Sequence, residues 1–202
     1  MQLLLFSGFL GSGKTTLIMA LARRMAGRGL TTCFVINEVG EIGIDGKILG
    51  DGGLDVYEIT SGCICCQIGV DLVTTLEDIS SRYDPDVVVV EASGVATPDG
   101  VLSNLVYYRG EPFESTRVVT VVDPTRLDAL MRVVEPLTRA QISSADYLVV
   151  TKVDQAEAPE LSDARQTLES LAPGTAVFEV RTDDEASFVP LLESVMRSGR
   201  WE

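Results

Sequence analysis

The sequence predicts an α/β fold with three layers, in which a mostly parallel central sheet of about seven strands is flanked by helices. Short apolar runs bounded by turn residues alternate with segments of helical periodicity, as in chains built from β–α–β units. Several runs, such as residues 87–90, are near-continuous Val, Ile or Leu, which is typical of strands covered on both faces. The 202 residues, 46% of them hydrophobic, suffice for one domain with a sizeable core.

Each element follows from its own pattern of residues. The expected strands cover residues 3–7, 32–37, 56–60, 87–91, 118–123, 147–151 and 176–180. The expected helices cover residues 14–27, 70–82, 98–107, 124–140, 161–171 and 186–197. Residues 39–53, rich in glycine and acids, are expected to form a loop, and residues 109–116 a polar connection. In such sheets a ligand binds at the carboxyl ends of the strands, so residues that follow the strands are the candidates for function.

Composition excludes several kinds of partner. The net charge of −14, from 16 basic and 30 acidic residues, argues against nucleic acid. No apolar stretch reaches the length of about 18 residues that a membrane span needs, so no membrane partner is expected. The apolar run at residues 2–6 has no basic residue before it and is interpreted as a strand, not an export signal. We therefore expect a cytoplasmic protein with reduced cysteines.

A phosphate-binding loop is predicted between the first strand and the first helix. The pattern Gly8-x4-Gly13-Lys14-Thr15 matches the Walker A motif in its required context, which defines the fold further as a three-layer P-loop NTPase. Lys14 should reach the β- and γ-phosphates, and the Thr15 hydroxyl should ligate Mg²⁺. Backbone amides at the start of the helix should point at the phosphates. The residues expected to hold them are Gly11, Ser12, Gly13, Lys14, Thr15 and Thr16.

The apolar run at residues 87–90 ends in Glu91, an acid that can hold a Mg²⁺-bound water. Ser93 and Gly94 follow, and a glycine there could let a backbone amide sense the γ-phosphate. Apolar strands often end in an acid, so Glu91 alone is a weak sign of Mg²⁺ binding. Its position between the other motifs strengthens the prediction.

The expected base is guanine. The strand at 147–151 ends in Thr151-Lys152-Val153-Asp154, which resembles the guanine-reading motif Asn-Lys-x-Asp with Thr in the first position. The Asp154 carboxylate can accept hydrogen bonds from both N1–H and the exocyclic amine of guanine, whereas adenine presents no such pair of donors. The stem of Lys152 would lie along the base. An exposed Lys and Asp at a turn is the alternative.

Three cysteines, Cys63, Cys65 and Cys66, follow another predicted strand. Thiolates so close together repel unless a cation shares them, so we expect Zn²⁺, Co²⁺ or Ni²⁺ there, with buried or redox-prone thiols as the alternative. Glu38 and Glu41 follow the second strand and could face either Mg²⁺ or this metal, in a candidate switch loop. Cys33 lies within an apolar strand and is expected in the core.

Together these motifs resemble the metal-associated P-loop GTPases of the CobW/HypB/UreG family, and within it the CobW-like branch. The matching segments are residues 8–16, 37–45, 62–66, 91–94 and 151–154. The resemblance implies a slow GTPase whose hydrolysis of GTP to GDP is coupled to metal handling, or to loading a metal or cobalamin cofactor into a client protein. It implies catalytic roles for Lys14, Glu38 and Glu91, and metal ligands among Cys63, Cys65, Cys66 and Glu41.

Two features depart from the CobW-like pattern. Such proteins usually continue into a C-terminal domain, often with a His-rich stretch, whereas this chain ends at Glu202 and has no His. We expect residues 1–202 to form a single P-loop GTPase domain, with client recognition by residues 98–116. The usual polar residue after the acid at position 91 is replaced by Ala92, which weakens the prediction of γ-phosphate sensing.

Two other functions stay open at this stage. The chain could be a GTP-dependent activator of a client metalloenzyme that delivers no metal, with structural thiols. It could also be an ATP-using kinase for a small molecule, although Asp154 argues against adenine. No His and no obvious Gln is placed to orient the attacking water, so a client, a metal or a second copy in a homodimer is expected to complete the catalytic site.

Overall fold

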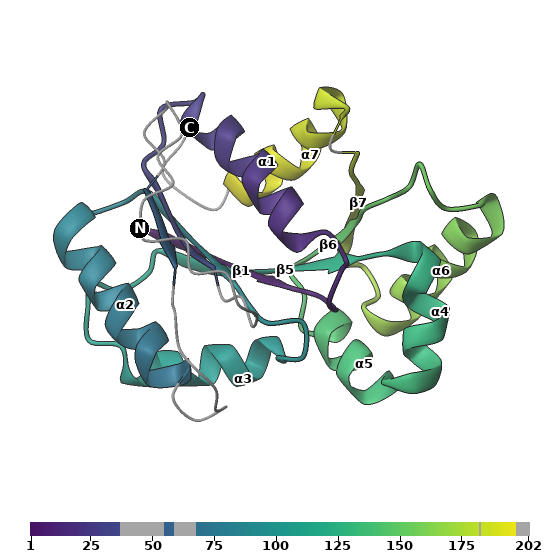
Figure 1. Cartoon of the computed structure of the whole chain (residues 1–202), viewed down its shortest axis with the longest axis horizontal. Helices are drawn as coiled ribbons and strands as arrows, with labels where there is room; N and C mark the ends of the chain where they lie inside the picture. Colours follow the sequence, from purple (N-terminus) through teal and green to yellow (C-terminus); the bar gives the residue numbers. More distant parts are fainter. Residues whose placement is uncertain (37–54, 59–67, 182, 197–202) are drawn as a thin grey trace.

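The structure, a computed structural model, describes residues 1–36, 55–58, 68–181 and 183–196. Within these residues a central sheet of seven parallel strands runs in the order β3-β2-β4-β1-β5-β6-β7. Figure 1 shows the sheet between its layers of helices. The predicted fold class is confirmed. The strands are β1 Gln2–Ser7, β2 Thr32–Ile36, β3 Asp55–Glu58, β4 Val87–Glu91, β5 Ser115–Val122, β6 Tyr147–Val150 and β7 Ala176–Glu179.

The register of the sheet brings the ends of four strands to one edge. β1 lies between β4 and β5, with Phe6 beside Glu91 and Ser7 beside Thr120. β5 and β6 end side by side. Because all the strands run parallel, the segments that follow β4, β1, β5 and β6 emerge together.

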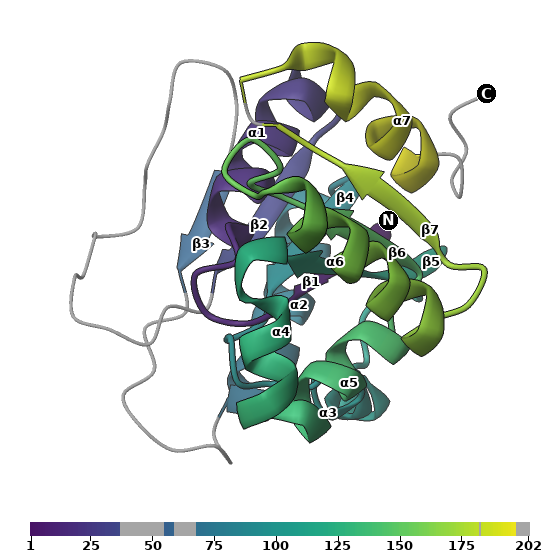
Figure 2. The same ribbon diagram turned by 90° about the vertical axis from the view of Figure 1, so that its right-hand side faces the viewer.

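Helices cover both faces of the sheet. α1 and α7 lie on one face, whereas α2 and α3 lie on the other, and α4, α5 and α6 gather beside β5 and β6 (Figures 1 and 2). The bounds are α1 Lys14–Ala26, α2 Ile68–Tyr83, α3 Pro98–Leu102, α4 Pro124–Val133, α5 Glu135–Ser143, α6 Ala158–Leu171 and α7 Glu185–Met196. None of the described helices is long and apolar enough to cross a membrane.

The alternation of side chains along β1 explains its unbroken apolar sequence. Leu4 and Phe6 belong to the core cluster beneath α1 and α7, whereas Leu3 and Leu5 belong to the cluster beneath α2. A third cluster joins β6 to α4, α5 and α6. A strand covered on both faces is mostly apolar, which is why the sequence pattern predicted these strands well.

The helix predicted over residues 124–140 is wrong as a single element. It divides at Val134, whose φ of −133° and ψ of 40° lie outside the helical region. In a continuous helix Pro136 would remove a backbone donor and clash with the preceding turn, so the chain begins a new helix with this proline in its first turn.

The helix predicted over residues 98–107 also differs. α3 ends at Leu102, and the 3-10 helix η1 Ser103–Tyr107 continues the chain. The Asn104 amide donates to the Gly100 carbonyl at 2.9 Å, a bond of the kind with which asparagine competes against regular helix. β5 begins at Ser115, earlier than predicted, within the segment interpreted as a polar connection.

Candidate functional site

The loop from β1 into α1 has the backbone of a phosphate-binding loop. Gly8, Gly11 and Gly13 adopt φ values of 131°, 78° and 90°, in the region that favours glycine. At Gly8 space imposes the same choice, because a Cβ there would clash with the carbonyl oxygen of Val121. Gly13 caps the N-terminus of α1. The motif predicted from the sequence therefore has the strand–loop–helix context that it requires.

Side chains form hydrogen bonds with the backbone carbonyls of this loop. The carbonyl groups of residues 8–12 each accept a hydrogen bond from a side chain. Lys14 Nζ donates to the first two at 2.8 and 3.2 Å, and Arg126 Nη1 to the third at 2.8 Å. Lys152 Nζ donates to the fourth at 2.7 Å, and the Thr151 hydroxyl to the fifth at 2.7 Å. Since a trans peptide holds its C=O and N–H on opposite sides, these bonds fix the direction of the loop amides.

Ser12 departs from the expectation that every amide of residues 11–16 points at a phosphate. Its N–H donates to the Phe9 carbonyl at 3.1 Å, within the loop. Its side chain is buried, and among the described residues the hydroxyl has no hydrogen-bond partner. Thr15 and Thr16 lie exposed in the first turn of α1.

Lys14 brings a desolvated cation to the loop. The residue is only 6% exposed. Burial of the ammonium lowers the pKa of Lys14, and the negative charge of Glu91 opposes this shift. A cation with little solvent around it interacts strongly with an anion, so Lys14 suits a phosphate ligand.

The Thr15 hydroxyl lies 2.9 and 3.1 Å from the two carboxylate oxygens of Glu91. The pair thus joins the start of α1 to the end of β4, and Glu91 is 7% exposed. Hydroxyl and carboxylate oxygens are hard ligands of the kind that Mg²⁺ takes beside nucleotide phosphates. The two residues predicted separately as Mg²⁺-associated therefore lie together and fit the ion.

The segment after β6 lies against the phosphate loop. Thr151 is 4% exposed, with its hydroxyl on the Ser12 carbonyl. Lys152 has a positive φ of 53°, and its ammonium reaches the Gly11 carbonyl. Asp154 is exposed and accessible to a ligand. The residues predicted to read the base therefore lie beside those predicted to hold the phosphates.

Sequence reasoning missed Asp123 as a functional residue. It is 4% exposed, and its Oδ2 accepts from Lys152 Nζ at 2.7 Å. Its Oδ1 accepts from the Thr125 N–H at 3.0 Å, which caps α4. An acid at the end of an apolar run and directly before a proline is a readable sign of a helix N-cap. Its partnership with Lys152 had no such sign.

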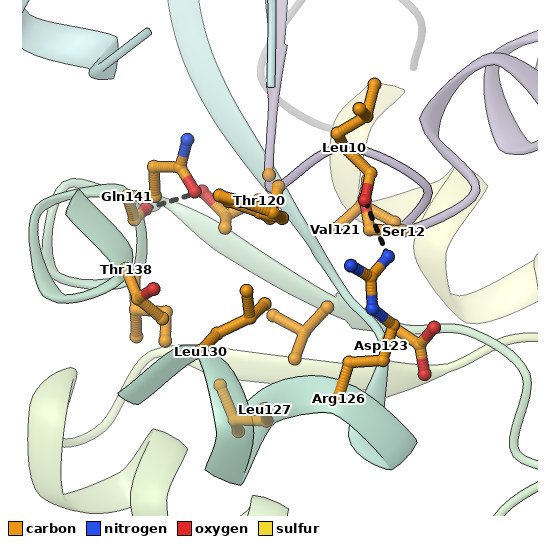
Figure 3. Close-up of a pocket in the computed structure, with 14 residues that line it drawn as sticks. Leu10, Ser12, Thr120, Val121, Asp123, Arg126, Leu127, Leu130, Thr138 and Gln141 are labelled. Atoms are coloured by element: carbon orange, nitrogen blue, oxygen red, sulfur yellow. Dashed lines mark hydrogen bonds between the residues drawn. The ribbon is translucent and has the colours of Figure 1, made fainter. Parts of the chain in front are cut away.

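Arg126 was missed as well. Its guanidinium donates to Leu10, as Figure 3 shows, and lies 5.9 Å from the centre of the Phe9 ring. A cavity of about 20 Å³ lies between this part of the loop, β5, α4 and α5 (Figure 3). It has room for about one water molecule and is too small for a nucleotide.

The predicted metal ligands Cys63, Cys65, Cys66 and Glu41, and the predicted catalytic Glu38, lie outside the described residues. Cys33 is described and is 1% exposed in the core, as predicted. Within the described part of the chain, no group of three or more His, Cys, Asp or Glu could hold a metal ion.

A P-loop at the carboxyl end of a central parallel strand, with a hydroxyl–carboxylate pair beside it, defines a P-loop nucleotide-binding domain. The chain belongs to the CobW/HypB/UreG family, whose nucleotide-binding domain matches residues 2–179.

Curated relatives carry names that refer to zinc. The chain is 33% identical over 195 residues to the zinc chaperone CobW of Sinorhizobium sp, covering 81% of this chain and 54% of that protein. It is 34% identical over 163 residues to the zinc chaperone YeiR of Escherichia coli K12, covering 80% and 49%. It is 30% identical over 177 residues to the zinc-regulated GTPase metalloprotein activator 1 of Schizosaccharomyces pombe, covering 81% and 42%. The chain thus spans about half the length of the curated relatives that it matches.

Solved structures support the fold. Zn(II)-bound YjiA GTPase from E. coli aligns with a TM-score of 0.64 at 22% identity, covering 89% of this chain and 57% of that one. HypB from Helicobacter pylori in complex with nickel aligns with a TM-score of 0.66 at 18% identity, covering 98% and 86%.

Proposed function

We propose that this chain is the GTP-binding and GTP-hydrolysing domain of a metallochaperone or metal-cofactor loading GTPase, and that residues 1–202 act as one domain. The observation that carries the proposal is the bond from Lys152 Nζ to the Gly11 carbonyl at 2.7 Å. It ties the candidate base-reading segment to the candidate phosphate loop. A nucleotide held by the loop amides and Lys14 would then have Asp154 available for the guanine edge.

The site supports hydrolysis through electrostatics. Lys14 would neutralise charge on the β- and γ-phosphates, and the Thr15–Glu91 pair would hold Mg²⁺ and one of its waters. Mg²⁺ supplies a positive charge that lowers the cost of charge on the leaving phosphate. The chain has no His and no obvious Gln placed to orient the attacking water, so we expect Glu38, a client, a metal or a second copy in a homodimer to complete the site. We expect slow hydrolysis until that partner is present.

Metal handling is supported by the names of the relatives and by the chemistry of Cys63, Cys65 and Cys66. Three thiols suit Zn²⁺ first, with Co²⁺ and Ni²⁺ as competitors, and they leave room for a further ligand such as Glu41. Incomplete coordination favours transfer to a client metalloprotein or cobalamin-dependent protein. We expect a cytoplasmic protein, in which these thiols would stay reduced.

Calorimetric titration of Zn²⁺ into the nucleotide-free, GDP-bound and GTPγS-bound protein tests the proposal. We expect one tight site and an affinity that differs between the GDP and GTPγS states by about 5-fold or more, the range of ordinary allosteric coupling. Cys65→Ser should abolish the coupling. Cys33→Ala removes a thiol from the core and should leave the coupling intact. Equal Zn²⁺ affinity in all three states would contradict metal coupling and favour a nucleotide-dependent activator that delivers no metal.

A further inference from the structure

The buried polar side chain of Gln141, on α5, forms hydrogen bonds with a segment that is distant in the sequence. It is 2% exposed. Its Nε2 donates to the Ala96 carbonyl at 2.9 Å and to the Gly94 carbonyl at 3.3 Å. A buried amide is costly unless its hydrogen bonds are made, so these bonds account for a glutamine in this place.

The segment that Gln141 holds begins directly after Glu91 and passes over the phosphate loop. The Ala92 N–H donates to the Phe6 carbonyl at 2.9 Å, which extends the pairing of β4 with β1. Gly94 then packs on the loop, since a Cβ there would lie 2.5 Å from the Leu10 nitrogen. The segment thus joins the Mg²⁺-associated carboxylate to the tip of the phosphate loop, with no space for a side chain at position 94.

α5 is itself anchored to the sheet at this glutamine. The hydroxyl of Thr120, on β5, donates to the backbone carbonyl of Gln141 at 2.7 Å, as Figure 3 shows. Thr120 is 1% exposed and lies beside Ser7, the residue that precedes the phosphate loop. The backbone of Gln141 is therefore fixed from the sheet, and its amide can position the segment at residues 92–96.

The direction of one peptide group gives this contact a role. Gln141 draws the Gly94 carbonyl towards α5. Because a trans peptide holds its C=O and N–H on opposite sides, the Val95 N–H is turned away from α5. Val95 is 72% exposed, so its surroundings are open to a ligand. A backbone amide fixed in direction beside the phosphate loop is suited to bind an anionic oxygen.

We propose that Gln141 is a positioning residue for recognition of the terminal phosphate of a nucleoside triphosphate. It holds the segment at residues 92–96 so that a backbone amide there distinguishes the triphosphate from the diphosphate. This inference rests on the proposed function and adds to it a specific coupling between α5 and the γ-phosphate. Loss of the two Gln141 bonds should weaken triphosphate binding more than diphosphate binding, because the diphosphate has no oxygen at that position.

The test compares the dissociation constants of GTPγS and GDP, with Mg²⁺ present, for four proteins. They are the wild type, Gln141→Glu, Gln141→Met and Thr138→Val. Glu and Met keep the length of the side chain and lose its donors. Thr138 lies one turn away on α5 and is 4% exposed. Its hydroxyl donates to the Val134 carbonyl within the same turn, so it controls for a general weakening of α5.

We expect both Gln141 variants to raise the dissociation constant of GTPγS about tenfold relative to that of GDP. Loss of a buried hydrogen bond produces an effect of this size. Thr138→Val should leave the ratio within about twofold of wild type. An unchanged ratio in a folded Gln141 variant would overturn the inference while leaving GTP binding intact. A wild type that binds neither nucleotide would instead overturn the proposed function.

Hydrogen exchange on the wild type gives a second test that needs no variant. GTPγS should slow exchange of the Val95 amide relative to GDP. Equal exchange in the two complexes would contradict the proposed contact even if the Gln141 variants do not fold.

Discussion

Asp123 offers a sharp test of how the site is built, because one buried carboxylate joins the candidate base-reading segment, residues 151–154, to the start of α4. Its Oδ2 accepts from Lys152 Nζ at 2.7 Å, and its Oδ1 accepts from the Thr125 N–H and hydroxyl at 3.0 and 2.7 Å. Asp123→Asn keeps the shape of the side chain and an oxygen for the helix cap. It replaces the charged acceptor that faces Lys152 with an amide donor.

The expected loss follows from the contact and its exposure. Hydrogen bonds to charged groups contribute about 1.5–3 kcal/mol. The side chain of Asp123 is 3% exposed, whereas that of Lys152 is 31% exposed and can recover part of its hydration. We therefore expect Asp123→Asn to lower the free energy of unfolding by about 2 kcal/mol, which lowers Tm by roughly 4–8 °C in a chain of this size.

Urea denaturation of nucleotide-free protein measures this loss. A cycle with Lys152→Met and the double variant should give a coupling energy of about 1.5 kcal/mol between the two side chains. Asp128→Asn is the matched control, because that carboxylate pairs with Arg132 on the surface, where both side chains are 76% exposed, and should cost less than about 0.5 kcal/mol. A loss below about 0.5 kcal/mol for Asp123→Asn, or zero coupling, would refute the reasoning.

Three further predictions address the same site. Gly94→Ala places a Cβ 2.5 Å from the Leu10 nitrogen and should cost about 1–3 kcal/mol of stability, measured by urea denaturation. Glu91→Gln removes the charge that faces the Thr15 hydroxyl and should raise the Mg²⁺ concentration required for tight GTP binding about tenfold, measured by titrating Mg²⁺ against fluorescent GTP. Asp154→Asn presents one donor and one acceptor to the base, so the affinity for GTP should fall by about 10-fold or more. The affinity for a nucleotide with a carbonyl in place of the guanine amine should rise, and competition binding measures both changes.

Each of these has a control and a contrary result. Gly27→Ala, at a φ of −62°, should be tolerated, and equal costs for the two glycine variants would contradict the close packing at Gly94. An unchanged Mg²⁺ requirement in Glu91→Gln would remove Glu91 from the Mg²⁺ site. Asp184→Asn changes another exposed carboxylate and should not alter base preference. Retained guanine preference in Asp154→Asn would exclude Asp154 as the base reader.

Much of the fold could be predicted because local sequence determines it. The central strands β1 and β4 are buried on both faces, so their residues are mostly apolar, as in Val87-Val88-Val89-Val90. The phosphate loop needs glycines at positive φ, and those glycines stand in the sequence at fixed spacing. The break at Val134 could have been predicted from Pro136, whose ring is incompatible with the interior of a long helix.

The network around the loop was not predictable, because it depends on packing between distant segments. Arg126 and Gln141 reach the loop and the segment after β4 only once α4 and α5 are packed. Lys152 was predicted to lie along a base, and its additional bond to Asp123 depends on the adjacent ends of β5 and β6. Neither residue type nor spacing carries a sign of such contacts. The predicted roles of the Cys63–Cys66 cluster, Glu38 and Glu41 stay predictions.

The most direct test of the central claim, that this P-loop holds a guanine nucleotide with Mg²⁺, is competition of GTP and ATP against a fluorescent GDP, with Mg²⁺ and with EDTA. GTP should displace the probe at a concentration about 100-fold or more below that of ATP, because only guanine offers the paired donors that Asp154 can accept. Removal of Mg²⁺ should weaken GTP binding. Equal displacement by ATP and GTP, or GTP binding that is indifferent to Mg²⁺, would contradict the claim.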